Sequence, residues 1–410
     1  MAAKAHSVEH VVMTGHIVDS LLLSKVLDSI RSRGGKYHLH GLVLGENPDD
    51  ISTASIEVIA DTPDQLQAIL KEIHPHGAVP RHPHDVKTVV ADVDGAFPDG
   101  FYCSTNFRTE IRVHGKWIEV LDQEMDCGIR LDGESARCIP MTAVAKGDCI
   151  VVGQNGIRVF PPDAEIRRHE LFEFMASPVS SERPKGVSVR EIAAAMKRAK
   201  AAGEKVMAVL GPAVVHTGGG EHVVELIRRG LIDVIFAGNA LATHDLEQAL
   251  YGTSLGVSFD RGLPTSEGHE HHLRAINSIR RWGGIAKAVE SGHVKSGIMH
   301  EAVKRKIPFV LCGSIRDDGP LPEVITDILA SQTEMRKHIP GTGFCLMVAT
   351  TLHSIAVGNL LPAWIKVACV DINPATVTKL MDRGSSQTVG IVSDAEPFLR
   401  SLVAEIAKSS

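Results

Sequence analysis

The sequence lacks the features that mark membrane-spanning, exported and nucleic-acid-binding proteins. It has no uncharged apolar run of about 18 residues, and residues 1–20 hold no continuous apolar core of signal-peptide length. It has no run of five basic residues, and 43 Lys plus Arg against 49 Asp plus Glu give a formal net charge of -6. We therefore predict a cytoplasmic protein with neither a membrane nor nucleic acid as its partner.

The number and spacing of the cysteines also differ from those of a disulfide framework or a zinc site. The seven cysteines are odd in number and widely spaced, and no two of them form a CxxC pair. We expect reduced thiols. Apolar residues make up 44% and charged residues 22% of the chain, which is ordinary for globular proteins. A chain of 410 residues is expected to form at least two domains.

The first 180 residues divide into two regions that differ in predicted secondary structure. Residues 1–80 read as strand, helix, strand, strand, helix, with Thr62 as the N-cap of a helix over 62–77, and this order predicts a ferredoxin-like α/β subdomain. Residues 81–180 hold short β runs broken by Gly, Pro and Asp, which predict a β-rich subdomain. A Ser/Pro-rich stretch over 172–188 marks the boundary that follows.

Residues 181–410 alternate regularly between helical segments and short apolar runs. Six such runs are expected as strands, over 205–215, 233–240, 308–319, 343–352, 365–371 and 388–394. Among the helices we expect one over 322–339. Uninterrupted apolar strands separated by helices predict a parallel sheet covered on both faces.

Ligands of such a sheet bind beyond the carboxyl ends of its strands, where helix N-termini present free N–H groups. Asp371 closes one strand, and its carboxylate can accept both ribose hydroxyls of a nucleotide or simply cap the next helix; Asp394 has the same two interpretations. Asn239 and Ala240 follow another strand, where a small residue and an amide suit a phosphate or a ring. The HTGGG segment at 216–220 offers N–H donors but does not match GxGxxG.

Two further groups of residues have open interpretations. The GHEHH segment contains Glu267 and His269, which suit acid/base chemistry, substrate contact or an ordinary helix start; metal binding is the least favoured because HExxH spacing is absent, and we predict no metal. Asn106 and Arg112 lie near each other in the β region. Arg112 either pairs with a substrate carboxylate or belongs to a ladder of surface charges.

Several long segments together resemble one known family. They are GFYCSTNFRTEIRVHGKWIEV, FAGNALATHDLEQALYGTSLGV, GHEHHLRAINSIRRWGGI, LCGSIRDDGPLPEVITDI and ATTLHSIAVGNLLP followed by VDINPATVTKLMDRGSSQ. The sequence is similar to the archaeal-type ornithine cyclodeaminases, which share the conserved region named after bifunctional lysine-oxoglutarate reductase/saccharopine dehydrogenase. The likeness extends from residue 15 to residue 394.

The resemblance implies a C-terminal Rossmann-like, deoxyhypusine-synthase-like domain with NAD as a recycled cofactor. The implied reaction converts L-ornithine to L-proline and ammonia: hydride leaves the substrate Cα, the δ-amine attacks the resulting imine, ammonia departs and the hydride returns. A homo-oligomer is implied as well. The implied cofactor contacts are Asn239, Ala240, Asp317, Thr351, Leu352, His353, Asp371, Ile372, Asp382 and Arg383.

The chemistry needs a base and an acid that titrate near neutrality. The histidines best placed for this are His216, His244, His269 and His353, and Asp245 or Glu267 is expected to orient one of them or to hold the distal amine. One segment departs from the family pattern, because STNFRTEIRV stands where STNHPTYVR is expected. The substrate therefore stays open, and the alternatives are a dehydrogenase of a basic or opine-like amino acid and a non-catalytic, NAD-responsive binding protein.

Overall fold

The protein is described from a computed structural model of the whole chain. The residues that it describes are 6–18, 20–45, 50–81, 83–161, 185–255, 257–258, 270–317, 319–382 and 388–408. The chain divides into two compact units, unit 1 with residues 1–171 and 359–364, and unit 2 with residues 172–358 and 365–410. Three domains with boundaries near residues 80 and 180 stay a prediction. Within the described ranges, every helix is too short or too polar to traverse a bilayer.

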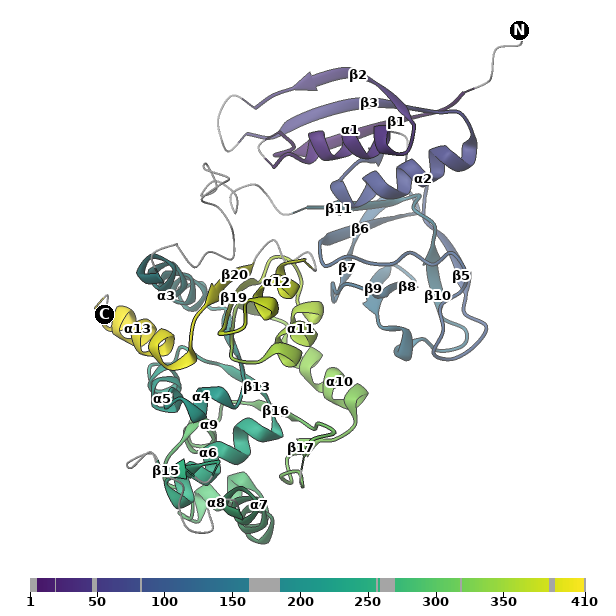
Figure 1. Cartoon of the computed structure of the whole chain (residues 1–410). Coiled ribbons are helices and arrows are strands. Elements are labelled where there is room, and N and C mark those ends of the chain that lie inside the picture. Colours follow the sequence, from purple (N-terminus) through teal and green to yellow (C-terminus); the bar gives the residue numbers. More distant parts are fainter. Residues whose placement is uncertain are drawn as a thin grey trace. The chain divides into compact units, whose positions relative to one another are not determined.

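Unit 1 begins with a four-stranded antiparallel sheet in the order β2-β3-β1-β4. Its elements are β1 (Ser7–Gly15), α1 (Leu22–Ser32), β2 (Lys36–Val43), β3 (Ser52–Ala60), α2 (Pro63–Ile73), η1 (His74–His76) and β4 (Val79–Pro80). Alternate residues of β3 are buried, and α1 and α2 lie along one face of the sheet (Figure 1). Thr62 caps α2 by accepting from the backbone N of Gln65 at 3.2 Å. The predicted ferredoxin-like arrangement is confirmed.

The rest of unit 1 is a seven-stranded sheet in the order β11-β6-β7-β9-β8-β10-β5. Its elements are β5 (Lys87–Val90), β6 (Arg108–Val113), β7 (Lys116–Leu121), β8 (Gly128–Asp132), β9 (Ser135–Ile139), η2 (Met141–Ala143), β10 (Cys149–Val152) and β11 (Ile157–Phe160). Side chains such as Ile111, Ile129 and Ile157 form its buried core. The predicted β-rich region is confirmed, and β6 and β7 form an antiparallel hairpin in it.

Unit 2 is built on a parallel sheet in the order β17-β16-β13-β12-β18-β19-β20. The strands are β12 (Lys205–Leu210), β13 (Val234–Gly238), β16 (Phe309–Cys312), β17 (Val324–Ile325), β18 (Thr342–Val348), β19 (Lys366–Asp371) and β20 (Thr388–Val392). If β17 is set aside, the spatial order is 3-2-1-4-5-6, which is that of dinucleotide-binding Rossmann folds. The predicted Rossmann-like sheet is confirmed.

Helices cover both faces of this sheet, because its strands are buried almost throughout and need apolar partners on each side. The helices are α3 (Lys185–Ala201), α4 (Ala213–His216), α5 (Gly220–Arg228), α6 (Asn239–Tyr251), α7 (His271–Trp282), α8 (Ile285–Glu290), α9 (Ile298–Lys304), α10 (Ile328–His338), α11 (Thr351–Leu360), α12 (Pro374–Asp382) and α13 (Ala395–Lys408). A short hairpin of β14 (Thr253–Ser254) and β15 (Val257–Ser258) follows α6.

Four predicted elements are wrong in extent. The strands expected over 308–319 and 343–352 end at Cys312 and Val348. The strand expected over 205–215 ends at Leu210, and α4 begins at Ala213 directly after Pro212. The helix expected over 322–339 starts only at Ile328, because the side chain of Asp327 caps it by accepting from the backbone N of Ala330. The preceding β-branched residues Val324 and Ile325 instead pair with β16 as an edge strand.

Candidate functional site

The order of the strands in unit 2 fixes where a ligand would bind. Strands β12 and β18 are neighbours, yet β12 is followed by strands on one side of the sheet and β18 by strands on the other. Such a reversal opens a crevice beyond the carboxyl ends of the two strands. The two loops touch there, because a Cβ at Gly211 would overlap the carbonyl O of Ala349. Ala349 itself has a φ of 54°, a left-handed conformation that is costly for a residue with a side chain.

Several predicted cofactor residues lie along this carboxyl edge. Asp371 ends β19, is buried, and accepts from the backbone N of Asn373 through Oδ1 at 2.8 Å. Thr351 starts α11, and its hydroxyl shares a hydrogen bond of 2.7 Å with that of Thr376. The carboxylate of Asp317 accepts from the backbone N of Ser314 at 2.8 Å. Polar groups from three strand ends therefore gather at one edge.

Asn239 and His353 fill the centre of the same edge. Asn239 is buried at the start of α6, where its Oδ1 accepts from the backbone N of Leu321 at 3.0 Å. The ring of His353 packs on Gly238, since a Cβ there would lie 2.8 Å from its Cε1. Burial lowers the pKa of His353, and the Asp317 carboxylate opposes that shift. His353 is thus held as a neutral ring against the end of β13.

Large apolar side chains also stand in solvent at this edge. Ile315 follows β16 and is fully exposed, Leu352 follows β18 and is 80% exposed, and Ile372 follows β19 and is 71% exposed. Exposed apolar surface beside a few convergent polar groups is typical of a small-molecule site. These side chains suit a flat ring of a ligand better than they suit water.

Four more predicted cofactor residues are less informative. Ala240 lies half-buried in the first turn of α6. Asp394 is exposed, and its carboxylate accepts from the backbone N of Ala395, the residue that starts α13. Asp382 ends α12, but its side chain lies outside the described residues, as does Arg383. Their predicted contacts with a cofactor stay predictions.

A cluster of histidines lies between the elements that follow β12 and β13. His216 ends α4 and makes a 2.6 Å hydrogen bond from Nδ1 to the hydroxyl of Ser254. Its ring packs edge-on against that of His244 on α6, with the centroids 4.5 Å apart. His244 Nδ1 lies 2.9 Å from Oε2 of Glu247, whose carboxylate is fully buried. Thr253 donates to the other oxygen of Glu247 at 3.0 Å.

The two central rings of this histidine cluster, His216 and His244, have different electrostatic surroundings. Burial and, to a smaller extent, the neighbouring His244 lower the pKa of His216 to about 4, against the opposing effect of Glu247. His216 is therefore neutral at pH 7, with one ring nitrogen free to accept a hydrogen bond. His244 instead lies 2.9 Å from a buried carboxylate, which fixes the orientation of its ring. The pair has the geometry of a histidine oriented by an acid.

The start of α7 extends the histidine cluster. His271 Nδ1 and the Thr253 hydroxyl are 2.8 Å apart, and the His271 ring stacks on Tyr251 at 4.9 Å. The His272 ring lies 6.4 Å from that of His244. The predicted acid/base residues Glu267 and His269 lie outside the described residues. The structure therefore brings His216 together with His244, and the roles of Glu267 and His269 stay predictions.

Asp245 has surroundings that differ from those expected for a residue that holds substrate. It is buried in α6, and its two carboxylate oxygens accept from the backbone N of Ile298 at 2.7 Å and of Met299 at 2.8 Å. These amides form the N-terminus of α9. Burial raises the pKa of Asp245 to about 6, against the effect of the two amides. The carboxylate thus anchors one helix to another.

The predicted substrate residues belong to unit 1. Arg112 in β6 donates from Nη1 to the carboxylate of Asp85 and to the carbonyl O of Pro83, both at 3.0 Å. Asn106 is buried, and its backbone carbonyl O accepts from the backbone N of Ala363 at 2.8 Å. Its side-chain Nδ2 has no partner among the described residues. Arg112 is thus already paired, whereas Asn106 keeps an amide group that can bind a ligand.

Unit 1 also contains a cavity of about 640 Å³, a size common for small-molecule sites. His16, His76, Glu119 and Trp364 line it together with Arg108, one of the two residues that depart from the family pattern. The Arg108 guanidinium is paired with Glu119 at 3.1 Å and with Glu110 at 2.8 Å. The departure therefore adds no uncompensated positive charge to the cavity.

Sequence reasoning missed Glu247 and Ser254, the partners of the two central histidines. Glu247 follows His244 by three positions, and residues spaced in this way share one face of a helix, so the spacing was a usable signal. Ser254 lies in the two-stranded hairpin after α6, and no local pattern links it to His216. Only the fold brings that pair together.

Models of known families match nearly the whole chain. The LOR/SDH bifunctional enzyme conserved region matches residues 8–107, the first C-terminal region of ArgZ-like arginine dihydrolases matches 108–189, and their C-terminal Rossmann fold matches 190–402. The ornithine cyclodeaminase of Methanopyrus kandleri is 49% identical over 98% of this chain and 97% of its own. That of Methanothermobacter thermautotrophicus is 50% identical over 97% of each chain.

Solved structures agree with these matches. The apo crystal structure of ArgZ, an arginine dihydrolase from the ornithine-ammonia cycle in cyanobacteria, is 37% identical with a TM-score of 0.85. The ternary complex of AgrE with ornithine and NAD⁺ is 41% identical with a TM-score of 0.54. The match covers 100% of this chain in each case but only 59% of the longer ArgZ and AgrE chains. The chain belongs to the archaeal-type ornithine cyclodeaminase family of enzymes, which carries the LOR/SDH conserved region and the ArgZ-like C-terminal regions.

Proposed function

We propose that this enzyme is an NAD-dependent ornithine cyclodeaminase that converts L-ornithine to L-proline and ammonia. The observation that carries the proposal is the carboxyl edge of the unit 2 sheet, with buried Asp371 at the end of β19 in the strand order of dinucleotide-binding folds. The crystal of AgrE with ornithine and NAD⁺ supports it, since that protein is 41% identical to this chain. The full-length archaeal relatives carry the name ornithine cyclodeaminase.

The residues at this edge fit NAD. Asp371 uses Oδ1 for the turn that follows it, and Oδ2 has no partner among the described residues, so this oxygen can accept from a ribose hydroxyl. Exposed Leu352 and Ile372 flank the edge and can contact the flat face of a ring. The N-terminus of α11 presents free backbone N–H groups to a phosphate. Thr351, Asn239 and Asp317 would complete the contacts.

When bound, NAD supplies reversible hydride transfer, so that the overall reaction is a deamination without net oxidation. The proposed steps on the substrate conserve its atoms and electrons. Loss of hydride and a proton turns the α-amine into an imine, the δ-amine adds to the imine carbon, ammonia leaves, and the cyclic imine regains hydride and a proton as proline. The enzyme must therefore accept a proton from an ammonium group and return one to the departing amine.

We assign these proton transfers to the histidine cluster. His244 lies 2.9 Å from the buried Glu247 carboxylate, which orients its ring for proton transfer. Its neighbour His216 is neutral because burial lowers its pKa to about 4, so it can accept a hydrogen bond from a protonated amine without repelling it. Glu267 and His269 stay candidates for the same role. Asp245 is assigned to holding α9 in place rather than to substrate.

On the substrate side, the unpartnered Nδ2 of Asn106 is proposed to bind substrate, because a buried amide group without a partner is costly. Arg112 is the weaker candidate because Asp85 already neutralises it. A homo-oligomer and a cytoplasmic location also stay proposals, and light scattering of the purified enzyme would test the first of them.

The decisive experiment incubates the purified enzyme with L-ornithine without added NAD. Proline and ammonia are expected in equal amounts, with no accumulation of NADH, because the cofactor is regenerated in each cycle. Steady formation of NADH with excess NAD⁺ would indicate a dehydrogenase instead. Binding of NAD without turnover across a panel of basic amino acids would indicate a binding protein, and no affinity for NAD would overturn the proposal.

A further inference from the structure

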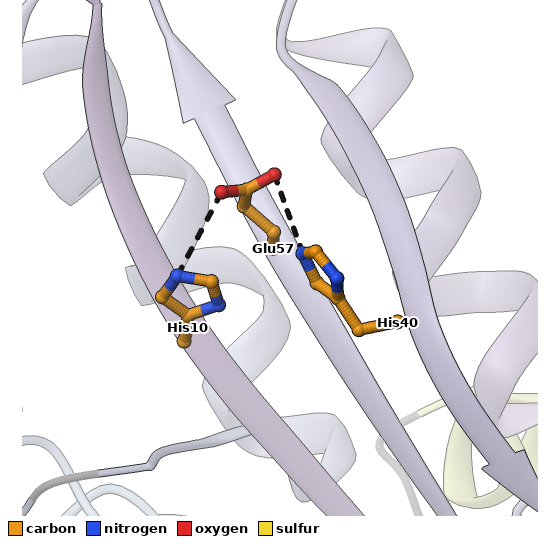
Figure 2. A group of neighbouring side chains, drawn as sticks. All are labelled: His10, His40 and Glu57. Carbon is orange, nitrogen blue, oxygen red and sulfur yellow. Dashed lines mark ion pairs between the residues drawn. The ribbon is translucent and has the colours of Figure 1, made fainter.

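Three side chains from three strands converge on the face of the N-terminal sheet opposite α1 and α2. His10 comes from β1, Glu57 from β3 and His40 from β2 (Figure 2). His10 lies directly opposite Glu57 in the antiparallel register, and opposed residues project from the same face. The pairing of β2 with β3 is irregular between Leu39 and Gly41, so His40 lies in a bulge. A bulge redirects a side chain, and here the ring points toward Glu57.

The distances within this group are those of ligands around an ion. His10 Nε2 lies 3.7 Å from Glu57 Oε1, and His40 Nε2 lies 3.4 Å from Glu57 Oε2. Both exceed the usual range of about 2.7–3.2 Å for an N–H···O hydrogen bond. A tetrahedral Zn²⁺ with bonds of about 2.0–2.1 Å separates its ligand atoms by about 3.3 Å. One atom from each of the three residues lies within 4.8 Å of the others, so small side-chain rotations bring them into range.

The donor set selects the kind of ion. Two imidazole nitrogens and one carboxylate oxygen suit Zn²⁺ and similar transition ions, whereas Ca²⁺ and Mg²⁺ require mainly oxygen ligands. The side chains of His10 and His40 are 44% and 51% exposed, and that of Glu57 is 22% exposed. An ion can therefore reach the group from solvent, and a water molecule can occupy its fourth position.

Stability alone does not explain the group. Exposed ion pairs contribute little to folding, and these two require protonated histidines. We propose that His10, His40 and Glu57 form a Zn²⁺ site that ties β1 and β2 together across β3. The site is separate from the proposed reaction and involves neither ornithine nor NAD.

The test titrates the tag-free, EDTA-treated full-length enzyme with ZnCl₂ in a calorimeter. The chain has 21 histidines, so the measure is the difference between the wild type and the variants H10A, H40A and E57Q. Each variant is expected to lose one bound ion per chain or to bind it at least about tenfold more weakly, as even changes around the ligands do. The matched control is H38A, since His38 is exposed on the same strand and also opposes Glu57.

Two further measurements keep the outcome clear. The melting temperature without metal is expected to be the same for all of these exposed-site variants, which checks that they fold. Zn²⁺ is expected to raise the melting temperature of the wild type and of H38A only, because an ion that binds the folded state stabilises it. Equal Zn²⁺ binding by the wild type and E57Q would overturn the site, and so would a loss in H38A as large as that in H40A.

Discussion

The two sheets of this enzyme place their polar side chains differently. In the N-terminal sheet, β3 alternates between buried and half-exposed residues, so polar groups such as Glu57 stand on the middle of a strand. In the parallel sheet of unit 2, strands such as β12 and β19 are buried from their second residue onward, and polar groups appear only where strands end. A sheet with one solvent-exposed face can carry a site on that face. A sheet covered by helices on both faces can carry a site only beyond the ends of its strands.

The largest expected effect concerns the histidine cluster, which follows the carboxyl ends of strands in the unit 2 sheet. Replacement of His244 by Gln keeps a side chain that can donate to Glu247 but removes the group that gains and loses a proton. We expect kcat for ornithine to fall on the order of 10²–10⁴-fold, as is usual for loss of a general acid or base. NAD affinity should not change.

The matched control for that change is H222Q. His222 lies on α5 in the same unit and contacts Glu396 at 3.4 Å, outside the histidine cluster. Its replacement should leave kcat at the wild-type value. An H244Q enzyme with wild-type kcat would remove the proton-transfer role that we assign to His244 and Glu247.

This contrast between the sheets also explains what could be predicted from the sequence. The buried strands of unit 2 are recognisable because each is a short apolar run, and the residues that follow a run, such as Asp371, can be assigned to a binding edge from the sequence alone. Residues on an open face give no such signal. His10, His40 and Glu57 look like ordinary outward-facing residues of amphipathic strands, and only the register brings them together.

Two further features of unit 2 differ from what the local sequence suggests, and contacts in the fold explain both. Glu is usually an exposed residue, yet Glu247 is completely buried, and His244 and Thr253 contact its carboxylate. Val324 and Ile325 read as the first turn of a helix, and they form a strand because β16 offers an unpaired edge. In each case contacts made in the folded chain decided the outcome, and local propensity did not.

The second prediction concerns pH and Asp245. Burial raises the pKa of Asp245 from 3.8 to about 6, so between these values the folded protein binds a proton that the unfolded chain has lost. The stability of unit 2 should therefore be highest below pH 4 with respect to this group and should fall as the pH rises to 6. One pKa unit corresponds to about 1.4 kcal/mol, so the loss is at most about 3 kcal/mol.

The variant D245N tests this dependence, because Asn keeps an acceptor for the α9 amides but cannot ionise. Urea unfolding of the wild type and of D245N at several pH values between 4 and 6 should give a slope for the wild type and a flatter curve for the variant. Parallel curves would show that Asp245 has the same pKa in the folded and the unfolded chain, which would contradict the prediction.

The third prediction separates the two interpretations of Asp371. If its carboxylate accepts from a ribose, D371A should weaken NAD binding about tenfold to a hundredfold, since hydrogen bonds to charged groups contribute about 1.5–3 kcal/mol. Calorimetry or quenching of protein fluorescence would measure the affinity. The control is D327A, which removes a carboxylate that caps α10 on the same sheet. Equal NAD affinities for D371A and the wild type would leave Asp371 as a helix cap only.

The smallest expected effect compares the two units directly through a matched pair of helix caps. Thr62 caps α2 in unit 1, and Asp327 caps α10 in unit 2. Either replacement by Ala should cost about 1 kcal/mol. Because the units have separate cores, T62A should lower only one calorimetric transition and D327A only the other. If both variants shift a single transition equally, the units unfold as one body, and the contrast between the two sheets then concerns local structure and not independent stability.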